Sequence, residues 1–183
     1  MQFTHDTEVA LQLAAALVNT ALDGREHLTD EAALDRFLRE QQMSGVTRID
    51  ADDVTAVRRL RAELDRVWDA AAEDDIVDVV NSLFADAGAM PRLTRHDGWD
   101  WHLHLTTDDA PIVERLGTEA AMGLADLVRA KDLDRLKRCD AQDCDAVLVD
   151  LSRNRSRRYC DTGNCGNRQH VAAYRARKAA ERA

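Results

Sequence analysis

The four cysteines of this 183-residue chain lie together in its last quarter. They form two pairs, Cys139 with Cys144 and Cys160 with Cys165; each pair encloses four residues, and fifteen residues separate the pairs. Two close pairs of thiols on separate turns can supply the four ligands of a tetrahedral zinc ion without a large core. Four thiolates leave no position for a catalytic water, so the spacing predicts one structural Zn²⁺ per chain.

Disulfide bonds, or four buried thiols without a metal, are the alternatives to a zinc site. The first residues have no basic start and no apolar segment. We therefore expect no signal peptide and a reducing, cytoplasmic location. Clustered cysteine pairs in such a compartment favour metal binding over disulfide bridges.

The residues around the cysteines indicate how the ligands are held. A short strand is predicted for residues 146–149, and residues 152–158 are too polar to be buried and should form an exposed loop. A helix is predicted from Asn167 to Glu181, with Cys165 at its entrance. Backbone N–H groups and the helix dipole favour a thiolate there.

Basic residues gather in the same region. Residues 137–183 hold 11 Lys and Arg against 6 Asp and Glu, a net charge of +5, whereas residues 1–136 hold 14 against 28, a net charge of −14. The basic region is thus the expected phosphate-binding surface of an otherwise acidic protein. The residues expected to contact nucleic acid are Arg153, Arg155, Arg157 and Arg158 in the loop and Arg168, Arg175, Lys178 and Arg182 on the final helix. Base reading is expected from Arg168 or its neighbours at the start of that helix.

These residues also carry a family resemblance. The run Cys165-Gly166-Asn167-Arg168, preceded by Asp150-Leu151-Ser152-Arg153-Asn154 and Arg157-Arg158-Tyr159-Cys160, closely resembles the CGNR zinc finger of bacterial proteins. Upstream, Leu17-Val18-Asn19-Thr20 and His102-Leu103-His104-Leu105-Thr106 resemble the helical ABATE domain that accompanies this finger and is described as a stress-induced transcription regulator. The resemblance covers essentially the whole chain and implies a zinc-binding regulator that binds DNA.

The remaining sequence must position the finger. Its composition is 45% hydrophobic but only 4% aromatic, which is typical of tightly packed helices rich in alanine. No apolar run approaches the ~20 residues of a membrane helix, so we expect a soluble protein. We predict a mainly α fold: a helical N-terminal domain over residues 1–135 with one β-hairpin, and a small α+β zinc finger over residues 136–183, without a flexible linker.

Apolar residues at helical spacing predict the helices of the first domain. They cover residues 8–22, with Gly24 as a stop, then a helix capped by Thr29 that runs to Gln41, then 50–71, 74–87, and a long helix that starts at 108–111 and runs to Val128. Asn19 is a polar residue beside the first apolar stripe. It could brace a neighbouring loop or contact a ligand.

Residues 91–106 change to a strand-like pattern around Asp97-Gly98, a dipeptide typical of tight hairpin turns. Alternation puts Trp99, Trp101, Leu103 and Leu105 on one face, which we expect to pack on the helices, and His102 and His104 on the other. The two histidines could hold a metal or a small anionic ligand. With no obvious third ligand nearby, hydrogen bonds at a strand edge are the simpler interpretation.

The interpretation we favour is a DNA-binding transcription regulator that is not an enzyme, with the helical domain as a sensor or a dimerisation unit. The first alternative is a protein-interaction module whose finger docks an acidic partner of the transcription machinery. The second is a metal-dependent enzyme centred on His102 and His104. Salt-dependent binding to random duplex separates regulator from docking module, and catalytic activity or a metal stoichiometry above one would indicate the enzyme.

Overall fold

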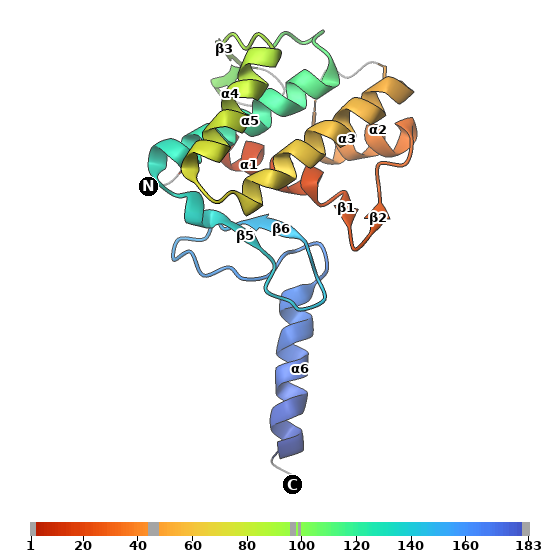
Figure 1. Cartoon of the computed structure of the whole chain (residues 1–183), viewed down its shortest axis with the longest axis vertical. Helices are drawn as coiled ribbons and strands as arrows, with labels where there is room; N and C mark the ends of the chain where they lie inside the picture. The colour runs from red at the N-terminus through yellow and green to blue at the C-terminus, as the bar shows by residue number, and fades with distance from the viewer. Residues whose placement is uncertain (1–2, 44–47, 96–97, 99, 181–183) are drawn as a thin grey trace.

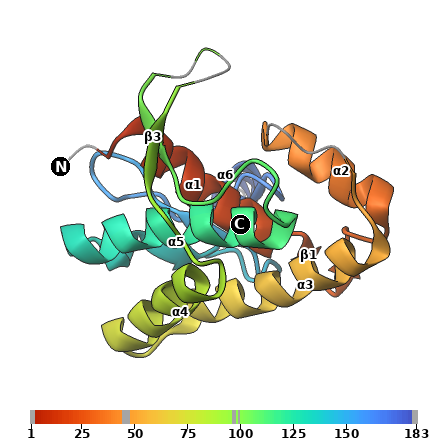
Figure 2. The ribbon, with the colours of Figure 1, turned by 90° about the horizontal axis from the view of Figure 1, so that it is seen from above.

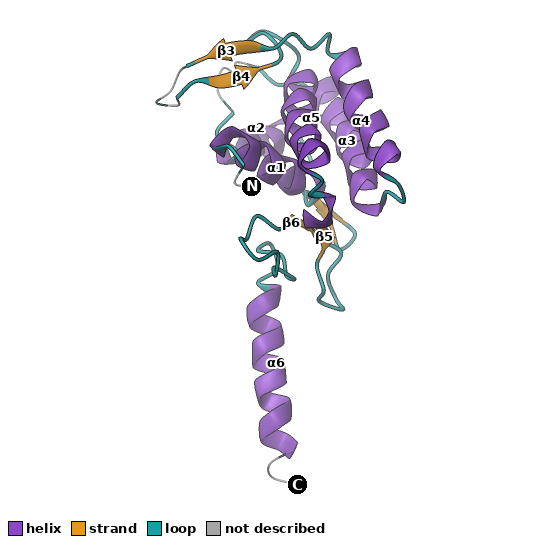
Figure 3. Cartoon of the chain, turned by 90° about the vertical axis from the view of Figure 1, so that its left-hand side faces the viewer, coloured by secondary structure: helices purple, strands orange, loops and turns teal. Residues whose placement is uncertain are grey.

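The computed structural model of the chain describes residues 3–43, 48–95, 98 and 100–180. Within them, five α-helices pack together as a body, and a small module with two strands and one helix follows (Figure 1). The last helix projects from this module away from the body, as two perpendicular views show (Figures 1 and 3). The predicted fold class, a helical domain followed by an α+β finger, is confirmed.

The helices of the body are α1 (His5–Val18), α2 (Glu31–Glu40), α3 (Ala51–Asp65), α4 (Glu73–Asp86) and α5 (Ile112–Ala130), with 3₁₀ turns at Arg66–Asp69 and Leu133–Arg135. Of these, α2 and α3 begin at an aspartate that caps them. Asp50 and Asp53 form a capping box at the start of α3. The cap of α2 is Asp30, which accepts from the backbone N–H of Ala33 at 2.8 Å, and not Thr29 as predicted.

The helix α5 runs between α1 and α4 and is the centre of the core (Figure 2). Its residues Leu116, Leu124 and Leu127 are completely buried. A Cβ atom on Gly123 would lie 3.0 Å from Cγ of Leu11 and 3.1 Å from the backbone nitrogen of that residue. Because that space is filled, only glycine lets α1 and α5 approach so closely.

A short hairpin follows α1 where a continuing helix was expected. The strands β1 (Ala21–Leu22) and β2 (Arg25–Glu26) pair antiparallel around Asp23 and Gly24, whose φ angles are +53° and +71°. The prediction that the first helix reaches residue 22 was therefore wrong. An Asp-Gly pair favours a turn with two positive φ angles, and this local preference ends the helix at Val18.

The second hairpin has the predicted strands but the opposite face toward the body. The strands β3 (Arg92–Thr94) and β4 (His102–His104) pair antiparallel; Asp97 of the predicted turn and Trp99 lie outside the described residues. Trp101 is 62% exposed and Leu103 is 37% exposed, whereas both histidines are half-buried. The expectation that the tryptophan face packs on the helices was wrong for Trp101 and Leu103. The histidine face meets the body instead, where α1 supplies Asp6 and α5 supplies Arg115.

The C-terminal module is joined directly to the body. The strands β5 (Leu136–Arg138) and β6 (Val147–Val149) pair antiparallel, and α6 spans Cys165–Ala180. Val147 and Val149 belong to the hydrophobic core of the body, while Leu148 packs with the cysteines. Successive side chains of β6 therefore point to opposite faces, so one strand contributes to the core of the body and to that of the module. Among the described residues, no helix is long and apolar enough to cross a membrane.

Candidate metal centre and nucleic-acid interface

The four cysteine sulfurs meet at one point between β5, β6 and α6. All four side chains are buried, and their Sγ atoms lie within 4.8 Å of one another. The Sγ atom of Cys160 lies 3.6 Å from that of Cys144 and 3.6 Å from that of Cys165. Zinc–sulfur bonds of ~2.3 Å in a tetrahedron place the sulfurs ~3.8 Å apart, so the set fits one zinc ion held by thiolates.

The two cysteine pairs are joined by backbone hydrogen bonds. Cys139 ends the β5 segment and donates from its N–H to the carbonyl of Ala146 at 2.8 Å. Asp140 donates to the carbonyl of Arg158 at 2.9 Å, which ties the first turn to the loop before the second pair. The N–H of Cys160 donates to Sγ of Cys139 at 3.4 Å. Hydrogen bonds of this kind orient thiolate ligands and stabilise part of their negative charge.

The second pair is closed by a tight turn into α6. A Cβ atom on Gly163 would lie 3.0 Å from Sγ of Cys165, so this position needs glycine. Cys165 is the first residue of α6, as predicted. Arg168 donates to Sγ of Cys165 at 3.1 Å and to Asp143 at 2.6 Å. Burial alone would raise the pKa of Cys165, but Arg168 and the neighbouring thiols hold it below its usual value.

The loop between β6 and the second pair is anchored on Asp150, which is fully buried. Its carboxylate accepts from Nζ of Lys137 at 2.6 Å and from the backbone N–H groups of Ser152 at 3.0 Å and Arg157 at 2.8 Å. Burial would raise the pKa of Asp150, but these donors lower it to about 2. The ionised carboxylate therefore fixes the polar loop without apolar packing.

Most of the arginines predicted to contact nucleic acid are paired with carboxylates of the chain. The pairs are Arg155 with Asp132 and Asp134, Arg157 with Asp161, Arg158 with Asp140, and Arg168 with Asp143. Each would have to share or give up its partner to bind a phosphate. Their role in nucleic-acid binding stays a prediction, and in this structure they brace the finger.

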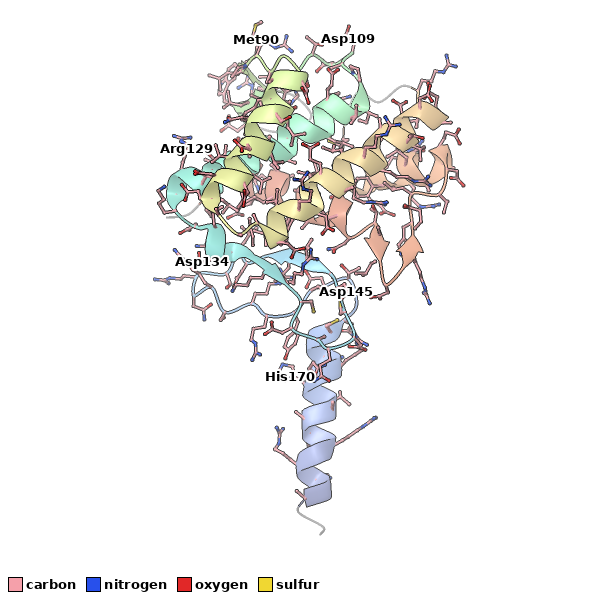
Figure 4. All side chains as sticks on the ribbon, viewed as in Figure 1. Met90, Asp109, Arg129, Asp134, Asp145 and His170 are labelled. Carbon is pink, nitrogen blue, oxygen red and sulfur yellow. The ribbon has the colours of Figure 1, made fainter. Side chains whose placement is uncertain are left out.

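The remaining basic side chains lie on the surface. Within the described residues, Arg153, Arg175 and Arg177 form no ion pair, and Lys178 lies over the ring of Tyr174 at 5.5 Å. The described side chains of α6 from His170 onward are exposed and point away from the helix on several sides (Figure 4). Arg177 was not predicted because it lies off the helix face that carries Arg168 and Arg175, and Arg182 lies outside the described residues.

Family models match both parts of the chain. Residues 11–131 match the ABATE domain, described as "Putative stress-induced transcription regulator", and residues 135–178 match the CGNR zinc finger. The first match covers more than half of the chain. The chain belongs to the ABATE family. A comparison with curated proteins found no match. The four cysteines of the CGNR finger are positioned to bind one structural zinc ion.

The CGNR finger is clamped to the ABATE domain by Asn19, which follows α1, and by polar groups at the end of α3 and in the 3₁₀ turn after it. The amide of Asn19 donates to the carbonyl of Val147 at 2.9 Å and accepts from its N–H at 2.8 Å, as a neighbouring strand would. Trp68 donates from Nε1 to the carbonyl of Leu148 at 3.1 Å. Arg138 binds Asp69 at 2.6 Å and Asp65 at 3.0 Å. Asn19 therefore braces the finger.

The two histidines of the hairpin lie apart from Asn19, at the end of the ABATE domain far from the finger. They line a cavity of about 200 Å³. The helices α1 and α5 and the chain after α2 supply its other walls, among them Asp6, Leu13, Met43, Arg115 and Glu119. The structure thus brings His102 and His104 together at a cavity, and leaves Asn19 at the joint between the domains.

Proposed function

We propose that this ABATE-family protein is a transcription regulator that binds duplex DNA through α6 and the adjoining loop of the CGNR finger, without a catalytic role. The observation that carries the proposal is α6 itself. This helix of 16 residues contains Arg168, Arg175, Arg177 and Lys178 and no Asp or Glu, and it projects from a body with a large negative charge. Concentration of positive charge on one projecting element is the electrostatic pattern of a nucleic-acid surface.

The dimensions of α6 suit the major groove. At 1.5 Å per residue the helix is ~24 Å long, and the major groove, ~12 Å wide, admits one α-helix. The zinc ion fixes the first residue of the helix, so the orientation of the exposed part is set by the finger. Arg175 and Arg177 can neutralise phosphates without breaking an ion pair of the described chain. Phosphate contacts of this kind position a protein on DNA.

Docking of the finger on another protein is the second candidate. A helix that docks into an apolar groove presents large apolar residues at spacings of three and four over several turns. On α6 only Val171 and Tyr174 are large, apolar and exposed, at 41% and 53%. Two such residues beside four basic ones favour a phosphate backbone over an apolar groove.

The ABATE domain would control where α6 points. Asn19, Trp68 and Arg138 hold β5 and β6 against the body, so the finger cannot turn independently without losing these bonds. We propose that a signal received by the helical body changes DNA affinity through this joint, which is the form that coupling between two sites takes.

The test compares two triple variants on zinc-loaded protein by fluorescence anisotropy with a random duplex. One variant changes Arg175, Arg177 and Lys178 to Ala; the matched control removes the same charge from exposed positions of the body, Arg36, Arg59 and Arg129. We expect the first to weaken binding by about tenfold or more at low salt and the control by less than about twofold. Equal effects, or no duplex binding by the unmodified protein, would favour the docking module.

A further inference from the structure

The cavity of the ABATE domain contains a pair of imidazoles in contact. The Nε2 atoms of His102 and His104 lie 3.1 Å apart, and the two ring centroids are 4.9 Å apart at 64°. Bonds of 2.0–2.1 Å from one transition-metal ion place two imidazole nitrogens ~2.9 Å apart at 90° and ~3.4 Å apart at the tetrahedral angle. The observed separation lies between these limits, so the two nitrogens are spaced as two ligands of one ion are.

The Nδ1 atom of each ring has the surroundings expected when Nε2 binds a metal ion. Nδ1 of His102 lies 2.7 Å from the carbonyl oxygen of Asp100, which can only accept, so Nδ1 carries the proton and Nε2 carries the lone pair. Nδ1 of His104 lies 3.9 Å from Oδ1 of Asp108. A proton on that nitrogen would face the carboxylate. Metal-ligating histidines have this pattern, with one ring nitrogen on the ion and the other directed at a carbonyl or carboxylate oxygen.

The cavity is suited to a cation. The carboxylates of Asp6 and Asp108 line it with one guanidinium, that of Arg115, and Glu119 adds a third carboxyl group. An anionic ligand would meet this excess of negative charge, while a divalent cation would be attracted to it. Imidazole nitrogen with nearby carboxylate oxygen is a donor set for Zn²⁺, Ni²⁺, Co²⁺ and Cu²⁺.

We propose that this cavity binds one divalent transition-metal ion through Nε2 of His102 and Nε2 of His104. The ion takes the place of the proton between the two rings, and that proton moves to Nδ1 of His104, beside Asp108. The site is separate from the cysteine site and lies at the opposite end of the body (Figure 3). That the ion acts as the signal of a regulator rests on the proposed function; the binding itself does not.

Two imidazoles hold an ion less tightly than four thiolates. Among the described residues only the cysteines form a set of three or more metal-binding side chains around one point. Water or a carboxylate that moves inward therefore completes the coordination at the histidines. We expect an exchangeable ion that desalting removes, whereas the zinc of the finger stays bound.

The test is a calorimetric titration of zinc-loaded, tag-free full chain with Ni²⁺. We expect one site of about micromolar dissociation constant in the unmodified protein, and at least about a hundredfold weaker binding in the double variant His102→Gln, His104→Gln. The matched control removes two exposed histidines, His27→Gln and His170→Gln, and should keep the site. No saturable site in the unmodified protein, or the same loss in both double variants, overturns the proposal.

Two further measurements keep the test independent of folding defects. The Cu²⁺ form of the unmodified protein should show hyperfine coupling to two imidazole nitrogens in its electron paramagnetic resonance spectrum; absence of nitrogen coupling contradicts the site. Asp108→Asn should weaken Ni²⁺ binding by up to about tenfold with the stoichiometry unchanged, because the carboxylate faces Nδ1 of His104 from 3.9 Å but is largely exposed. DNA binding is measured on the same samples. Ni²⁺ binding without DNA binding would contradict the proposed regulator function and leave the metal site supported.

Discussion

The ABATE domain and the CGNR finger are stabilised by different kinds of interaction. In the body, large aliphatic side chains such as Leu11, Leu34 and Leu64 are excluded from solvent. In the finger, the buried set consists of the four cysteines with two alanines and Leu148, and its loop is held by the carboxylate of Asp150. The body can therefore fold by hydrophobic burial, while the finger needs its metal.

Within the finger, the basic residues have two different roles. Arginines near the zinc are used to hold loops and thiolates, as Arg155 and Arg168 show. Arg175, Arg177 and Lys178, further along α6, form no ion pair within the described chain, and Lys178 contacts the ring of Tyr174. Basic residues that contribute little to the fold are the ones available to a partner.

The largest expected effect comes from removal of a zinc ligand. Cys160→Ser should abolish zinc retention and unfold the finger with α6, because structural zinc contributes ~10–16 kcal/mol to the folding of small modules. The helices α1 to α5 should remain, so circular dichroism should lose roughly the signal of α6 alone. A chelator acting on the unmodified protein should give the same spectrum. Retention of one zinc by the variant would contradict the ligand set.

A cavity made in the core of the body should lower the stability of the body without removing zinc from the finger. Leu116 is fully buried at the centre of α5, so Leu116→Ala should lower the free energy of unfolding by about 2–5 kcal/mol. Zinc content measured by elemental analysis should stay at one ion per chain at a temperature where the variant is folded. Loss of zinc from the folded variant would show that the two parts do not form separate stabilising units.

Removal of the hydrogen bonds that join the body to the finger should have an intermediate effect on stability. Asn19→Ala leaves the N–H and the carbonyl of Val147 without their partner, which should cost about 2–3 kcal/mol. Hydrogen exchange of the Val147 amide should accelerate, while exchange in α4 should not. Asn19→Asp is the sharper control, because it keeps the acceptor for the N–H and loses only the donor. Equal exchange in all three proteins would refute the clamp.

The smallest effect is a pH dependence confined to the body. Burial raises the pKa of Glu119 to about 7, although Arg115 opposes the shift. A carboxyl group whose pKa is raised by folding favours the protonated form, so its contribution is complete below pH ~4.5 and is lost as the pH rises through about 7. For this partly accessible side chain the loss should be about 1–2 kcal/mol. Glu119→Gln should remove it, seen as a flatter plot of unfolding free energy between pH 5 and pH 8 than in the unmodified protein.

The sequence predicted the parts that depend on local pattern. The spacing of the cysteines, the position of Cys165 at a helix start, and the helices with an apolar stripe all follow from periodicity and ligand chemistry. The strand β5 was missed because residues 136–138 are too short for a recognisable alternation. The hairpin at Asp23-Gly24 was missed because a glycine after an apolar stripe is equally typical of a helix end.

Long-range partners could not be predicted in the same way. Alternation correctly placed His102 and His104 on one face of a strand, but which face meets the body depends on what α1 and α5 present there. Likewise, nothing in a run of arginines tells which of them will meet a carboxylate. Arg155 pairs with Asp132 and Asp134 only because the finger folds back on the end of α5.

The most direct measurement of the central claim is the salt dependence of duplex binding by the zinc-loaded protein. Arg153, Arg175, Arg177 and Lys178 offer up to four phosphate contacts, so a plot of log affinity against log salt concentration should have a slope of about −3 to −4. Removal of zinc, which fixes the start of α6, should abolish the binding. A slope near zero, or no binding at low salt with one zinc per chain confirmed, would contradict DNA recognition by this helix.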